Sequence, residues 1–114
     1  MDEHPEPTPF AAGQVVTVFR SRLRDDVGDE YPEMAAHMLE LARSMPGFVD
    51  FKGFVAEDGE RVSLATFADA GAQRAWREHV EHRLAQQAGR DRFYAAYSLQ
   101  VAECTVAHGF VRDA

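Results

Sequence analysis

Residues 14–22 read QVVTVFRSR, a run in which apolar side chains occupy consecutive positions. Its β-branched and aromatic residues predict a strand. Because successive side chains of a strand point to opposite faces, Val15 and Phe19 belong to one face and Val16 and Val18 to the other. A strand that is apolar on both faces is usually buried on both. We therefore expect a sheet that is covered on both sides.

Two helical regions follow from the spacing of apolar residues. Residues 25–45 carry apolar side chains three and four positions apart, with Pro32 in the first turn and Pro46-Gly47 at the end, which predicts one helix. A second helix, capped by Asp69, is predicted to run to residue 80. A short helical turn over residues 81–88 is expected to end at Gly89.

Three more strands complete the predicted fold. Residues 48–57 and 61–68 form a hairpin around Asp58-Gly59. The last strand covers about residues 97–107, after a charged and aromatic connection at residues 90–94. The order β-α-β-β-α-β predicts an α+β, ferredoxin-like domain with a four-stranded antiparallel sheet. Two helices cover only one face of that sheet, so a second copy is the simplest cover for the other, and we expect a homodimer.

The chain of 114 residues suits one domain. We assign residues 1–12, with three prolines and three acids, to a flexible arm, residues 13–108 to the domain and residues 109–114 to a tail. The net charge of -7 argues against nucleic acid or an anionic membrane as a partner. One cysteine, no signal-peptide pattern and no apolar run of about 20 residues predict a cytoplasmic protein.

Candidate catalytic and ligand-binding residues occur close together in the second helical region, residues 69–88. Trp76 lies on the apolar stripe and is either a core residue or the wall of a pocket. His79 and His82 are three positions apart on one helical face, so they are candidates for a general base. Two histidines at this spacing could also hold a metal, but no HExxH motif supplies further ligands, and we predict no metal site.

Arginines and aromatic residues alternate after the second helical region. Arg83, Arg90 and Arg92 occur with Phe93, Tyr94 and Tyr97. They form either a solvated connection or a pocket rim, in which arginine holds an anionic ligand and tyrosine donates a hydrogen bond. On the first strand, we expect Arg20 to pair with Glu103 or Asp50 of a neighbouring strand.

Several short motifs resemble the antibiotic biosynthesis monooxygenase family. They are MPGF at 45–48, EDGERV at 57–62, AWR at 75–77, HVEH at 79–82 and GRDRFY at 89–94, and the likeness spans about residues 14–107. The chain is similar to the small, stand-alone bacterial members. The resemblance implies a dimeric α/β barrel, in which two sheets pack face to face. It also implies mixed activities, since some members oxidise polyketide-derived phenols to quinones with O₂ and no cofactor, and others bind and degrade haem.

The resemblance implies a cofactor-independent monooxygenase that acts on a small aromatic or quinol-like compound in a pocket between sheet and helices. His79 or His82 is then the catalytic base, Arg83 the anion partner and Trp76 the stacking wall. The remaining predicted substrate-binding residues are Phe19, Gln86, Phe93 and Tyr94. The alternatives are a haem-binding or other ligand-binding dimer without turnover, and a structural dimer with a vestigial pocket.

The haem-degrading branch of the family uses an Asn on the first strand, a Trp on the second helix and a His about three helical turns further on. Trp76 matches that tryptophan. The histidine position falls at Gln86, and Phe19-Arg20 stand where the first strand would carry the asparagine. Two of the three haem-branch residues are therefore absent, and we predict no cofactor.

Overall fold

Four strands form one antiparallel sheet in the computed structural model, which describes residues 9–112 apart from the side chains of residues 80, 81 and 84. The strands are β1 (Val15–Leu23), β2 (Phe48–Val55), β3 (Arg61–Phe67) and β4 (Tyr94–Glu103), and they lie in the order β2-β3-β1-β4. This is the predicted ferredoxin-like sheet, which is confirmed. Most of the predicted arm (residues 1–8) and the last two residues of the predicted tail lie outside the described residues.

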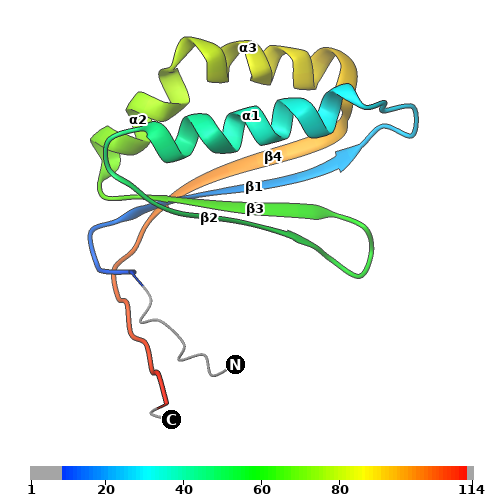
Figure 1. Cartoon of the computed structure of the whole chain (residues 1–114). Helices are drawn as coiled ribbons and strands as arrows, with labels where there is room; N and C mark the ends of the chain where they lie inside the picture. The colour runs from blue at the N-terminus through cyan, green and yellow to red at the C-terminus, as the bar shows by residue number, and fades with distance from the viewer. Residues whose placement is uncertain (1–8, 113–114) are drawn as a thin grey trace, which may run out of the picture.

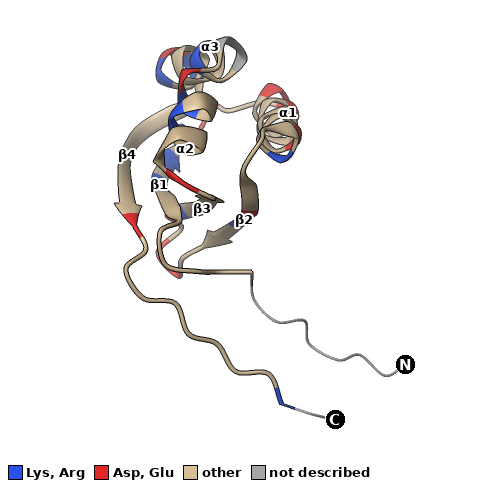
Figure 2. Ribbon diagram, turned by 90° about the vertical axis from the view of Figure 1, so that its left-hand side faces the viewer, with Lys and Arg blue, Asp and Glu red and all other residues tan. Residues whose placement is uncertain are grey.

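All the helices lie on one face of the sheet (Figure 1). They are α1 (Glu30–Ser44), α2 (Ala70–Glu78), α3 (Val80–Ala88) and a π-helical turn, η1 (Gly89–Phe93). Figure 2 shows α1 above β2, and α3 with α2 below it on the side of β4 and β1. Within the described residues, no helix has the length and apolar character needed to cross a membrane.

The apolar core sits under α2, between the helices and β3. Phe67 is fully buried and stacks on Trp76, with the ring centroids 5.3 Å apart. Phe48 meets Phe67 edge-on at 6.0 Å. A register shift between Phe48 and Asp50 brings Phe48 to the same face as Phe51, although the two are three positions apart. The core therefore fixes α2, and with it Trp76, against the sheet.

The predicted helices are correct in number and wrong at their ends. The first helix begins at Glu30 and not at Asp25, because residues 24–27 form a turn in which the Val27 N–H bonds the Arg24 carbonyl. Asp69 caps α2 as predicted, since its Oδ1 accepts from the Ala72 N–H at 2.8 Å. The chain leaves helical geometry at His79 (φ -60°, ψ 138°), so α2 ends two residues before the predicted end.

The last strand is shifted toward the N-terminus by three to four residues relative to its prediction. It begins at Tyr94, because Tyr94 pairs with Leu23 and the Arg24 N–H bonds the Phe93 carbonyl. Just past its end, Cys104 exchanges two backbone hydrogen bonds with Gly13 and Gln14. The expected connection at residues 90–94 is largely the π-helical turn η1.

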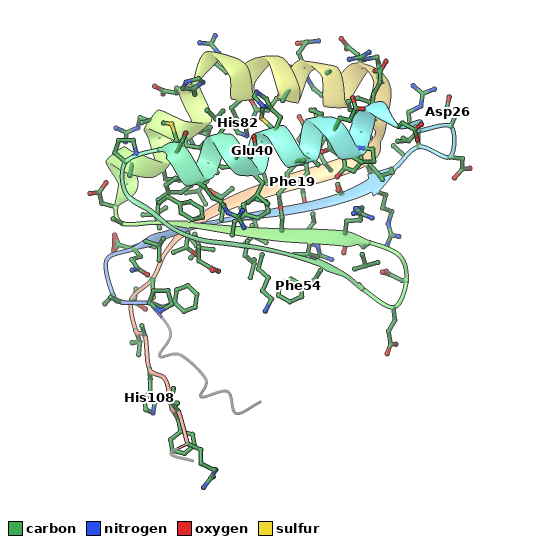
Figure 3. All side chains as sticks on the ribbon, in the orientation of Figure 1. Phe19, Asp26, Glu40, Phe54, His82 and His108 are labelled. Atoms are coloured by element: carbon green, nitrogen blue, oxygen red, sulfur yellow. The ribbon has the colours of Figure 1, made fainter. Side chains whose placement is uncertain are left out.

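The sheet face away from the helices is apolar along its centre, as the sequence predicts. Val16, Val18, Val62 and Leu64 are half-buried there in the single chain. Figure 3 shows Phe54 on this side, and it is 49% exposed. Arg20 pairs with Glu60 at 2.6 Å, so the predicted pairs with Glu103 or Asp50 are wrong. Arg20 lies opposite Val62, which places Glu60 within reach.

Candidate functional site

A pocket of about 490 Å³ lies between the sheet and the helices. Its floor crosses three strands along one row of paired residues, in which Phe19 lies opposite Ser63 and Ser63 lies opposite Gly53. The two small residues deepen the floor beside the phenylalanine ring. Side chains from all three α-helices close the pocket above, among them Tyr31, Met34, Met38, Trp76, His82, Ala85 and Gln86.

His82 is the buried titratable group of this pocket. Its imidazole is stacked on the indole of Trp76, with ring centroids 4.1 Å apart and 24° between the planes. His82 Nδ1 lies 3.3 Å from the Arg77 carbonyl oxygen. A carbonyl only accepts, so this contact assigns the proton to Nδ1 and leaves a lone pair on Nε2. Figure 3 shows His82 between α3 and α1, on the inner side of the helical layer.

Burial sets the charge of His82. Desolvation lowers the pKa of the imidazole, with a smaller lowering from His79, while the Arg77 carbonyl acts in the opposite direction. The neutral ring is therefore the dominant form at neutral pH. A neutral imidazole with a lone pair on Nε2 can accept a proton from a bound ligand.

Trp76 is a supporting residue of the site. It is only 6% exposed and contacts both Phe67 and His82 through its ring. Its indole Nε1 is buried and has no hydrogen-bond partner among the described residues. Little of the indole surface remains open to a ligand, so the geometry gives Trp76 the role of a platform that orients His82.

Four aromatic rings surround the other end of the pocket. Tyr94 meets Phe19 at 5.4 Å, Tyr97 at 5.7 Å and Tyr31 at 6.0 Å between centroids. Burial, followed by the interaction with Tyr31, raises the pKa of the Tyr94 hydroxyl above its ordinary value. Tyr94 therefore stays protonated, with its hydroxyl as a hydrogen-bond donor beside Tyr31.

Gly89 allows Tyr94 to reach this position. A Cβ atom built on Gly89 would lie 2.5 Å from Tyr94 Cε2, closer than any ordinary contact. The π-helical turn that begins at Gly89 carries the chain from α3 into β4 at this point. A glycine at the start of the turn is thus a structural condition for the aromatic end of the pocket.

Arg61 lies at the same end and was not predicted as a site residue. Its guanidinium carbon is 5.8 Å from the Tyr31 ring centroid, and it lies opposite Ser21 in the sheet. The sequence does contain a signal for it. Arg61 has the strand phase of Ala65 and Phe67, which predicts the same face of the sheet as those core residues.

The structure brings together five of the eight predicted site residues around the pocket: Phe19, Trp76, His82, Gln86 and Tyr94. The other three lie outside its lining. His79 is the residue at the break between α2 and α3, and its backbone N–H donates to the Trp76 carbonyl. Arg83 is exposed to solvent. Phe93 is buried in η1, where its ring meets Tyr31 edge-on at 5.7 Å.

The described side chains of the pocket do not form the donor set of a metal ion. Among the described residues, no group of three or more His, Cys, Asp or Glu side chains is placed to hold a metal ion. Gln86, where the haem-degrading branch has histidine, lines the pocket with an amide. The predicted difference from the haem-degrading branch at this position is thus a residue of the pocket wall.

A family model for antibiotic biosynthesis monooxygenases matches residues 14–88. The chain belongs to the antibiotic biosynthesis monooxygenase family. The match covers Phe19, the whole of β2 and β3, and the α2–α3 region with Trp76 and His82. The predicted family resemblance is confirmed.

Known relatives of this monooxygenase-family chain agree in length and fold. The uncharacterized protein YqjZ of Bacillus subtilis is 29% identical over 103 residues, which is 90% of this chain and 85% of YqjZ. A mutant of SnoaB, a cofactor-independent oxygenase from Streptomyces nogalater, superposes with a TM-score of 0.72 at 18% identity, over 84% of this chain and 97% of its own. A dimeric ferredoxin-like protein of unknown function from Thermobifida fusca superposes with a TM-score of 0.66 at 16% sequence identity. The superposition covers 88% of this chain and 99% of that protein.

Proposed function

We propose that this protein is a cofactor-independent monooxygenase that oxidises a phenolic aromatic compound to a quinone with O₂. The observation that carries the proposal is His82, a buried neutral imidazole with an oriented lone pair at the edge of an otherwise largely apolar pocket. Membership of the monooxygenase family supports it. So does the similarity in fold to SnoaB, which is a cofactor-independent oxygenase.

The reaction balances without an added reductant. A phenol with a hydrogen on the reacting ring carbon loses four electrons and becomes a quinone, and O₂ accepts those four electrons. One oxygen atom becomes the new carbonyl, and the other leaves as water with the phenolic proton and the ring hydrogen. The enzyme has to remove the first proton, stabilise the anion that meets O₂, and keep bulk water out.

Three side chains are assigned to these tasks. His82 accepts the phenolic proton on Nε2 and returns it to the departing oxygen as water forms. Trp76 orients the imidazole through the stacked contact and acts as a positioning residue. Tyr94, which stays protonated, lies at the other end of the pocket and positions the substrate by donating a hydrogen bond to an oxygen at that end. Phe19 and Gln86 complete the walls around the ring.

We also propose that two copies pack through the sheet faces that point away from the helices. The apolar centre of this face, with Phe54 exposed beside it, supports the arrangement. The dimeric ferredoxin-like relative from Thermobifida fusca supports it as well. The pocket lies on the opposite face of the sheet, between the sheet and the helices, so it is not part of this interface. Sedimentation of the chain and of a Leu64→Glu variant tests the arrangement. A monomeric wild-type chain would contradict it.

The test of the activity compares matched histidine variants on a panel of naphthols and hydroxyanthracenes. O₂ uptake and quinone absorbance are measured together. We expect His82→Gln to lower the turnover by about 10²- to 10⁴-fold, the usual effect of removing a general base. His37→Gln, at an exposed position on α1, is the matched control and keeps its turnover. His79→Gln in the same assay decides between the two predicted histidines, and we expect the loss at His82.

Two outcomes would contradict the assignment. If His82→Gln oxidised the phenols as fast as the wild type, His82 would not be the base. If the wild-type protein bound these phenols but consumed no O₂ with any of them, the chain would be a ligand-binding member of the family without turnover.

A further inference from the structure

The pocket has a second polar end, away from His82. Gln73 Nε2 donates to the Thr17 hydroxyl at 3.0 Å, which holds α2 and its Trp76 above Thr17. Arg61 lies opposite Ser21 on the same floor. Thr17 and Ser21 are four residues apart on β1, a distance of about 13 Å in a strand. The two ends are therefore separated by more than the width of one aromatic ring.

Arg61 gives this second end of the pocket a positive charge that no described carboxylate balances. Among the side chains that the structure describes in the pocket lining, Arg61 is the one Lys or Arg, and none is Asp or Glu. Four other arginines have carboxylate partners: Arg20 with Glu60, Arg22 with Asp58, Arg24 with Asp26 and Arg92 with Glu30. No described carboxylate pairs with Arg61, whose guanidinium lies over the Tyr31 ring.

Hydrogen-bond donors line the pocket together with the Arg61 guanidinium. Tyr94 contacts Tyr31 edge-on, and its raised pKa keeps its hydroxyl a donor. The hydroxyls of Ser21 and Ser63 lie on the floor nearby, where both residues line the pocket. A guanidinium together with neutral hydroxyl donors, with no described acid among them, suits a carboxylate in charge and in hydrogen-bonding capacity.

We propose that the pocket takes an aromatic substrate that carries a carboxylate, and that Arg61, Tyr31 and Tyr94 bind this carboxylate. The proposal rests on the proposed function only in placing the phenolic end of the substrate at His82. The length of the floor then requires that the two groups lie at opposite ends of a body longer than one ring. Arg61 and Tyr94 would thereby decide which phenols are substrates.

The test measures binding by NMR. The chain has a single tryptophan, so the one indole N–H resonance reports on Trp76 inside the site. The probes are 6-hydroxy-2-naphthoate, 2-naphthol, which has the same rings without the carboxylate, and octanoate, which has a carboxylate without the rings. We expect the wild type to bind 6-hydroxy-2-naphthoate about tenfold more tightly than either of the others, as one charge-assisted contact at a partly exposed site allows.

Variants then assign the preference to Arg61. Arg61→Met should remove the preference for 6-hydroxy-2-naphthoate over 2-naphthol, and Arg61→Lys should keep part of it. Arg43→Met removes the same charge from an exposed position on α1 outside the pocket lining and should leave the preference unchanged. Because Arg61 is exposed, its replacement leaves the fold intact, which the dispersion of the same spectra verifies.

Each contrary result has a separate meaning. Equal affinity of the wild type for 6-hydroxy-2-naphthoate and 2-naphthol, or a preference that survives in Arg61→Met, would overturn the carboxylate site. Octanoate binding as tightly as 6-hydroxy-2-naphthoate would overturn the aromatic class of the ligand. An Arg61-dependent preference without O₂ consumption would leave the carboxylate site standing, while the proposed oxygenase function would fail.

Discussion

The imidazole of His82 rests on the indole of Trp76, with 4.1 Å between the ring centroids. The two side chains come from different helices, since α2 ends at Glu78 and α3 begins at Val80. The break at His79 changes the direction of the chain, so that the first turn of α3 places His82 over Trp76. The stacking of the candidate base, His82, on Trp76 thus depends on the break in helical geometry at His79.

The Trp76–His82 stack predicts the effect of Trp76→Phe. A phenyl ring preserves the apolar contact with Phe67 but covers less of the imidazole. We expect water to reach His82, so its pKa should rise toward the ordinary value near 6.5. NMR titration of the His82 ring protons measures this shift. A purely structural role for Trp76 would lower the melting temperature and leave the histidine titration where it was.

The lowered pKa of His82 predicts an acid limit for both activity and stability. Well above pH 6.5 the ring is neutral in the folded and unfolded chains alike. As the pH falls below 6.5, the unfolded chain takes up a proton that the folded chain still resists, so the free energy of unfolding decreases until the pH reaches the lowered folded pKa.

Denaturant unfolding from pH 8 to pH 5 checks this slope. His82→Gln removes the titrating group and should flatten the curve in that range. The turnover should fall on the acid side of pH 6.5 for the same reason, since only the neutral ring accepts a proton. An acid limit of activity above pH 7 would contradict the role assigned to His82.

Most of the fold was accessible from the sequence because the hydrophobic pattern specifies it. The run of β1 that is apolar on both faces predicts one strand, the Asp58-Gly59 turn predicts a pair of strands, and the i, i+3, i+4 stripe predicts α1. The order of these elements along the chain allows few topologies. The phase of Phe48 was not accessible in this way. It depends on the register shift before Asp50, which strand alternation does not encode.

The site was only partly predictable for a related reason. Trp76, His82, Gln86 and Tyr94 were found from residue type and family motif. Which of two histidines lies in the pocket depends on the helix break at His79, and no proline or glycine marks that break in the sequence. Arg61 was missed because an arginine that follows a hairpin turn is usually exposed to solvent. Its position in the strand nevertheless predicts that it lies on the face of the sheet that the helices cover.

Gly53 predicts how the pocket floor tolerates a larger side chain. A Cβ atom built there would meet only the Val62 carbonyl oxygen, at an ordinary 3.9 Å. Gly53→Val should therefore fold, and its side chain should fill the pocket beside Phe19 and Ser63. We expect at least a tenfold loss of ligand affinity with an unchanged or higher melting temperature, since valine favours strands. Gln100→Val, on the opposite sheet face, is the control and should bind normally.

Gly89 predicts the opposite outcome. An added methyl group would lie 2.5 Å from the Tyr94 ring, and the tyrosine or the π-helical turn would have to move. We expect Gly89→Ala to lower the free energy of unfolding by about 1–3 kcal/mol, the usual cost of overpacking. Gly28→Ala is the matched control, because its Cβ would meet nothing within 4 Å. Equal stabilities of the two variants in urea would show that Tyr94 is free to shift.

The buried hydrogen bond between Gln73 and Thr17 predicts a non-additive pair of substitutions. Both side chains are almost fully buried, and the bond joins α2 to β1 under the His82 platform. Gln73→Leu or Thr17→Val alone leaves one polar group without a partner in the core, which costs about 1–3 kcal/mol. The double variant removes both groups, so it should be more stable than the sum of the single losses predicts. Urea unfolding of the four proteins measures the coupling, and simple additivity would mean that water replaces the missing partner.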